Sequence, residues 1–71
     1  MALDKPRPED IQTVRGIHPR ATSLSDYTLE DAWSEVRADH DEDGLAVGEI
    51  LASGRTQEEA WKNAADDIRG K

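Results

Sequence analysis

The sequence predicts a small, mainly α-helical domain of about three helices, at residues 28–39, 45–53 and 56–69. Three observations support this prediction. The hexapeptide from Thr28 to Trp33 recurs with two substitutions from Thr56 to Trp61, and apolar residues accompany both copies at helical spacing. A chain of 71 residues also has room for only one small core. We therefore expect two similar helices whose tryptophans anchor that core.

The first part of the chain, residues 1–25, is predicted to be an extended or loop-rich lead-in to an acidic globular domain, residues 26–71. Proline disfavours helix in the residue before it, so the stretch Lys-Pro-Arg-Pro that ends at Pro8 is expected to be extended. Pro8 is a favourable first residue for a short helix at 8–15, which would place Ile11 and Val14 on one face.

The first copy of the repeat predicts the helix at 28–39. Thr28 and Asp31 form an approximate capping box. The apolar residues then follow at i, i+3, i+4 and i+7: Leu29, Ala32, Trp33 and Val36. A strand would instead place Trp33, Glu35 and Arg37 on one face, a mixture that favours the helical interpretation.

The second copy predicts the helix at 56–69 by the same logic. Thr56 and Glu59 form the capping box, and Gly70 is the expected stop. The apolar stripe consists of Trp61, Ala64, Ala65 and Ile68. Both copies also run on to an aligned acid, Asp39 in the first and Asp67 in the second.

The segment between the copies is compatible with two structures. Four apolar residues pair up at helical spacing, with Gly54 as a stop: Ala46, Val47, Ile50 and Leu51. Because β-branched residues are scarce here, a helix at 45–53 is favoured. The alternative is an α+β fold with a short strand or hairpin around 44–54. Leu-Ala-Ser-Gly-Arg-Thr leading into Glu-Glu-Ala resembles the strand-to-helix join of HicB-type antitoxins, which implies a strand in this segment.

The charge is unevenly distributed. The net charge is −7, and residues 26–71 hold thirteen acidic side chains against five basic ones. An acidic body repels phosphates, so direct nucleic-acid binding is not expected. It favours a basic protein partner, or serves solubility alone.

Several classes of protein are disfavoured by composition. The chain has no cysteine, which excludes disulfides and thiol catalysis. No apolar stretch approaches the length of a membrane span and no signal peptide is visible, so a cytoplasmic protein is expected. The histidines and serines match no nucleophile motif, and the glycines match no phosphate-binding fingerprint. We therefore expect no enzyme, no cofactor and no metal. The thin core predicts either marginal stability or completion by an oligomeric partner, such as a second copy in a homodimer.

One stretch, Asp39 to Gly44, resembles the opening of an EF-hand calcium loop. Glu49 is one place too early for the bidentate ligand, since the twelfth loop position is Ile50. The preceding apolar stripe is also out of phase with an EF-hand helix. A solvated acidic turn is therefore favoured over a calcium site.

The leading hypothesis is a small acidic, non-catalytic interaction protein, of the inhibitor or antitoxin type, that occupies a basic surface such as the nucleic-acid channel of a partner. The residues predicted to contact the partner are Asp39, Asp41, Glu42, Asp43, Glu49, Glu58 and Glu59. One alternative is a helix-turn-helix DNA-binding regulator formed by 44–54 and the last helix, although that helix carries more acids than bases. The other is a degenerate EF-hand-like calcium module.

Overall fold

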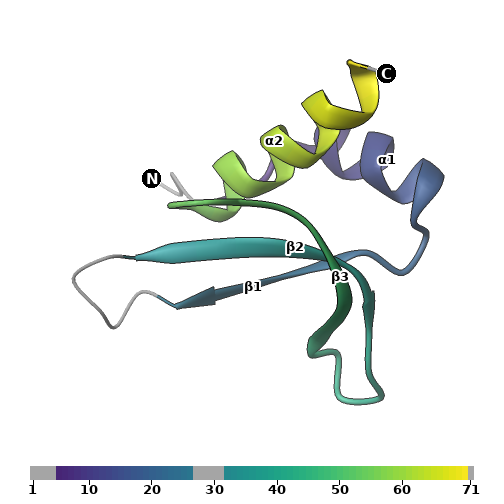
Figure 1. Ribbon diagram of the computed structural model, residues 1–71, viewed down its shortest axis with the longest axis vertical. Coiled ribbons are helices and arrows are strands. Elements are labelled where there is room, and N and C mark those ends of the chain that lie inside the picture. The colour runs from purple at the N-terminus through teal and green to yellow at the C-terminus, as the bar shows by residue number, and fades with distance from the viewer. Residues whose placement is uncertain (1–4, 27–31, 71) are drawn as a thin grey trace.

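The computed structural model describes residues 5–26 and 32–70 and has an α+β fold, so the mainly α-helical prediction is wrong. The elements in chain order are α1 (Pro8–Ile17), β1 (Thr22–Asp26), β2 (Trp33–His40), β3 (Ala46–Gly54) and α2 (Gln57–Arg69). The strands form one antiparallel sheet in the order β1-β2-β3 (Figure 1). β2 is therefore the central strand.

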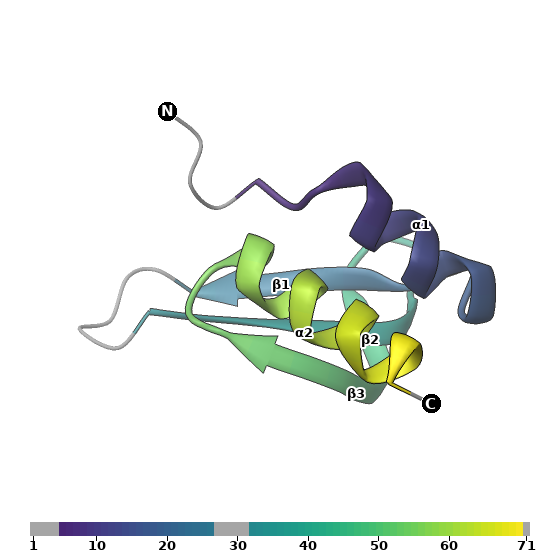
Figure 2. The same cartoon turned by 90° about the horizontal axis from the view of Figure 1, so that it is seen from above.

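The molecule has two layers. Both helices lie over the same face of the sheet, and no described element covers the other face (Figures 1 and 2). α2 packs directly on the strands, while α1 packs alongside α2. This arrangement gives each strand one face toward the helices and one face toward solvent.

The predicted N-terminal helix is confirmed. Pro8 occupies the start of α1, and the acidic side chains of its first turn favour the positive end of the helix dipole. Val14 is fully buried and Ile11 packs against the core, as their spacing predicted. The helix extends to Ile17, beyond the predicted end at residue 15.

The helix predicted at 28–39 is wrong where the structure describes it, because residues 33–40 form β2. The capping residues Thr28 and Asp31, and Leu29 of the stripe, lie outside the described residues. Ser34 and Val36 are fully buried beneath the helices. Their neighbours Trp33, Glu35 and Arg37 lie together on the open face. This mixture of side chains on one face is the reason that the sequence favoured a helix over a strand.

The mixed composition of that open face is tolerated because solvent reaches it. Trp33 is only partly buried there. The Arg37 Nε donates to Glu35 Oε2 at 2.7 Å, and its Nη1 donates to the Gly48 carbonyl of β3 at 2.9 Å. Polar side chains on this face therefore find partners without entering the core.

The helix predicted at 45–53 is also wrong, because residues 46–54 form β3, in agreement with the strand of the alternative interpretation. The pairing of β3 with β2 shifts register twice, between Val36 and Arg37 and between Arg37 and Asp39. Gly48 adopts a positive φ of 84° at the second shift, a conformation that glycine accepts without strain. These irregularities break the strict alternation that would have marked a strand in the sequence.

The second repeat copy forms the helix that it predicts. Thr56 is the N-cap of α2, and its Oγ1 accepts a hydrogen bond from the Glu59 backbone N–H at 3.1 Å. Gly54 does not stop a helix as expected but ends β3. A Cβ at Gly54 would lie 3.0 Å from the Ala60 nitrogen, so glycine permits the close approach of β3 to α2.

The core lies between α2, α1 and the sheet. Its buried members are Val14, Ala21, Val36, Ala60, Trp61, Ala64 and Ala65, with Ile11, Leu51, Ala52 and Ile68 packed against them. Trp61 is 2% exposed, and the Arg15 guanidinium lies over its ring at 5.6 Å. Of the two tryptophans, only Trp61 has the central position that the repeat predicted for both.

Buried charge joins the two helices. Asp10 of α1 is 1% exposed, and its Oδ1 lies 3.1 Å from the Arg69 Nη2 of α2. The same Arg69 nitrogen donates to Thr13 Oγ1 at 3.1 Å. Arg69 therefore links the C-terminal turn of α2 to α1.

Candidate functional site

Most basic side chains of the described residues are neutralised within the molecule. Arg7, Arg20, Arg37, Lys62 and Arg69 each form an ion pair with a carboxylate. Arg15 stacks over Trp61 and donates to the Ala21 carbonyl at 3.1 Å. The unpaired charge of the surface is therefore mainly negative.

Asp39, the first of the predicted contact residues, has a structural role. Its exposed side chain lies near the end of β2, where its Oδ1 accepts hydrogen bonds from Arg20 Nε and from the His40 backbone N–H. These bonds, with that from Arg20 the larger effect, hold the pKa of Asp39 below its ordinary value of 3.8. Arg20 also donates to the His40 carbonyl at 2.8 Å, so this network fastens the loop after α1 to β2.

Asp41 also has a structural role. Its Oδ1 accepts hydrogen bonds from the backbone N–H groups of Asp43 and Leu45, each at 2.9 Å. Gly44 completes the turn with a positive φ of 82°. The acidic run is thus the turn of the β2–β3 hairpin rather than the loop between two helices that an EF-hand requires. The geometry of the turn therefore accounts for the presence of Asp41 and Gly44 without a bound calcium ion.

Glu42 and Asp43 occupy the exposed tip of the same turn. Neither carboxylate forms an ion pair or accepts a hydrogen bond from a residue that the structure describes. The sequence prediction of a solvated acidic turn therefore fits these two residues.

Glu58 and Glu59 lie in the first turn of α2, away from the hairpin turn (Figure 1). Acids in a first helical turn favour the positive end of the dipole, typically by about 0.3–1 kcal/mol each. Their position therefore has a local structural explanation. The structure does not bring them together with the acids of the hairpin.

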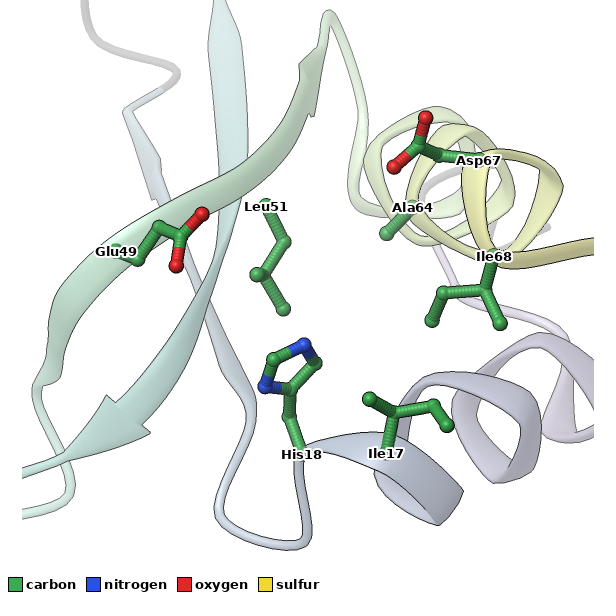
Figure 3. Close-up of a pocket in the computed structure, with 7 residues that line it drawn as sticks. All are labelled: Ile17, His18, Glu49, Leu51, Ala64, Asp67 and Ile68. Atoms are coloured by element: carbon green, nitrogen blue, oxygen red, sulfur yellow. The ribbon is translucent and has the colours of Figure 1, made fainter. Parts of the chain in front are cut away.

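Glu49 is the remaining predicted contact residue, and it lines a cleft of about 290 Å³. The other lining residues come from the end of α1, from β3 and from the last turns of α2: Ile17, His18, Leu51, Ala64, Asp67 and Ile68. Figure 3 shows Glu49 and Asp67 on opposite sides of this space, with Leu51 and the imidazole of His18 between the strand and the helices. Glu49 is exposed and forms no ion pair within the described ranges 5–26 and 32–70.

The cleft combines apolar walls with two carboxylates. Ile17 is 61% exposed, and Leu51 and Ile68 are partly buried. No lysine or arginine is among its lining residues. Chemically, such a cleft can bind a cation that carries an apolar stem.

Asp67 and His18 were not among the predicted contact residues. A signal for Asp67 existed, because it lies between Ala64 and Ile68 of the apolar stripe and so at the edge of the buried helix face. For His18 and Ile17 no local signal existed. Only the packing of α1 beside α2 brings them to β3.

Two further observations concern the described part of the chain. It contains no group of three or more histidine, cysteine or acidic side chains arranged to hold a metal ion. It also contains no helix long and apolar enough to cross a membrane.

Comparisons of the sequence and structure with protein-family models, with curated proteins and with solved structures found no match. The HicB-type resemblance thus remains limited to the strand-to-helix join at β3 and α2.

Proposed function

We propose that this chain is a small acidic, non-catalytic interaction protein, of the inhibitor or antitoxin type, that occupies a basic surface of a partner protein. One observation carries the proposal. Most basic side chains of the described residues form ion pairs within the molecule. The exposed carboxylates of Glu42, Asp43 and Glu49, in contrast, have no ion-pair partner among the described residues.

We assign the proposed contact surface to the β2–β3 hairpin and call it the hairpin end: the turn (Glu42 and Asp43) and the part of β3 where Glu49 lines the cleft. A single-sign surface of this kind steers a positively charged partner and penalises partners of like charge. Glu58 and Glu59 are not included in this surface, because their interaction with the positive end of the α2 dipole accounts for their position. Asp39 and Asp41 contribute by holding the hairpin in shape.

A basic protein surface fits this charge better than nucleic acid does. The net charge of −7 opposes the approach of phosphates. The helix-turn-helix alternative loses its structural basis, because its first helix would occupy residues that form β3. The basic surface of the partner could itself be one that binds nucleic acid, which this protein would then block.

The test begins with affinity capture of partners from the native host. Each captured protein is then purified, and its affinity is measured by titration calorimetry at low and at physiological salt. The affinity should fall as salt rises, because exposed charges are screened over about 8–10 Å. The double variant Glu42→Gln/Asp43→Asn should weaken binding about three- to thirtyfold.

The matched control is Glu58→Gln/Glu59→Gln, which removes the same charge in the first turn of α2, away from the hairpin turn. It should leave the affinity largely unchanged. If both double variants bind like the parent, or if affinity is insensitive to salt, the acidic hairpin serves solubility and the proposal fails.

A further inference from the structure

We infer that the cleft between β3, α1 and α2 receives a single arginine side chain of the partner protein. This inference rests on the proposed function, and it names the part of the hairpin end that recognises a particular side chain. It follows from the size of the cleft, from its apolar walls and from its two carboxylates.

The size of the cleft suits one side chain. Pockets that enclose small-molecule ligands usually measure about 300–1,000 Å³. At about 290 Å³, this cleft lies just below that range. A long, narrow group from a partner surface is therefore a better match than a free cofactor.

The walls suit the apolar stem of a long basic residue. Ile17 is 61% exposed and gains most from being covered. Leu51 and Ile68 flank the same space from β3 and α2 (Figure 3). Long basic side chains commonly lay their methylene groups on such apolar surface while the charged head stays near water.

The charges suit the head of that residue. The carboxylates of Glu49 and Asp67 stand on opposite sides of the space (Figure 3). A planar guanidinium has donors in several directions and can face two carboxylates at once. It also stacks on flat rings, and the imidazole of His18 extends into the cleft. Lysine, a compact and strongly hydrated point charge, uses these features less well.

The test is an NMR titration of the intact ¹⁵N-labelled protein with N-acetyl-arginine N-methylamide. Saturable shifts should be confined to the amides of the cleft, chiefly those of Leu51, Ala64 and Ile68. The citrulline analogue, which has the same shape without the charge, should bind at least about tenfold more weakly. Guanidinium ion alone should also bind more weakly, because it lacks the stem.

Matched variants separate this site from general attraction between opposite charges. Glu49→Gln should weaken arginine binding about three- to tenfold, whereas Glu58→Gln, with the same charge change outside the cleft, should not. Ile17→Ser should weaken binding, whereas Ile50→Ser should not, because Ile50 is similarly exposed at 53% but does not line the cleft. All four positions are exposed, so folding should persist in each variant.

Two outcomes would overturn the inference. One is shifts spread over all acidic regions and reproduced by sodium chloride at equal ionic strength. The other is equal binding of the arginine and citrulline analogues. If either occurs while Glu42→Gln/Asp43→Asn still weakens a captured partner, the proposed function stands and only the arginine site is lost.

Discussion

The two copies of the hexapeptide repeat lead into different structures. The first copy ends at Trp33, the first residue of the central strand β2, and the second lies at the start of α2, with Trp61 in the core. Aligned positions after the tryptophan are buried in both, Val36 at 0% and Ala64 at 2% exposure. A tryptophan with an apolar residue three places later therefore fits one face of a helix, and in a strand it fits two opposite faces.

The residues that distinguish the strand from the helix lie at and around these shared positions. Directly after the tryptophan, Ser34 is fully buried in β2, whereas the aligned Lys62 is exposed on α2. In the second copy, Ala64 and Ala65 are strong helix formers. The first copy has Val36 and Arg37 at those positions, which suit the two faces of a half-buried strand. Four predictions test this contrast.

The largest effect is expected from exchanging the residues that follow each tryptophan. Ser34 Oγ lies 2.5 Å from Ser25 Oγ of the neighbouring strand, so Ser34→Lys would bury an ammonium in place of a small hydroxyl. We expect a loss of roughly 4 kcal/mol or more, enough to unfold a domain of this size. Lys62→Ser loses only an exposed pair with Asp66, worth about 0.3–0.5 kcal/mol. Urea denaturation followed by circular dichroism measures both, and equal losses would contradict the central position of Ser34.

Replacing each tryptophan with alanine compares how much the two residues contribute to the free energy of unfolding. Trp61→Ala should cost about 3–5 kcal/mol, because it empties the middle of the core. Trp33→Ala should cost roughly 1 kcal/mol, the scale of cross-strand contacts on a partly exposed sheet face. The free energies of unfolding from chemical denaturation give the comparison. A Trp33 variant as unstable as the Trp61 variant would mean that both tryptophans anchor the core.

The cap of the second copy should have a moderate effect. Thr56→Ala removes the acceptor for the Glu59 N–H and should cost about 1 kcal/mol. For a domain of this size, that loss lowers the melting temperature by about 4–8 °C. Thr56→Ser keeps the hydroxyl and should melt close to the parent. An alanine variant that melts like the serine variant would show that the cap contributes little to α2.

The smallest effect concerns Asp39, the acid of the first copy that aligns with Asp67. Its folded-state pKa lies below 3.8, chiefly because Arg20 donates to its carboxylate. The ionised form therefore stabilises the folded protein at neutral pH, and this contribution is lost as pH falls from 3.8 through the lowered pKa. Because the pair is exposed, the contribution is small and screened by salt.

The check is urea denaturation of the parent and Asp39→Asn along this pH range. The parent should be the more stable at neutral pH, and the difference should shrink as Asp39 becomes protonated. A difference independent of pH would mean that the substitution acts through the hairpin geometry rather than through the charge.

The candidate site was predictable only in part. Glu42 and Asp43 are exposed at a turn, and an acidic run that ends in glycine predicts this locally. The cleft beside Glu49 was not predictable, since its lining comes from three segments distant in sequence. Contacts between distant residues also decide which acidic side chains are paired within the molecule. Asp39, which pairs with Arg20, is one example.

By itself, the sequence determined both helices, the acidic surface and the buried position of Trp61. Only the tertiary structure decided that residues 33–40 and 46–54 are strands and that three elements form a cleft. The physical reason is where the backbone hydrogen bonds go. Those of α1 and α2 close within each helix, so local caps and spacing indicated both helices, although the same signals wrongly indicated a helix at 28–39. Those of β2 go to β1 and β3, whose pairing depends on distant residues and on register shifts that the local pattern does not reveal.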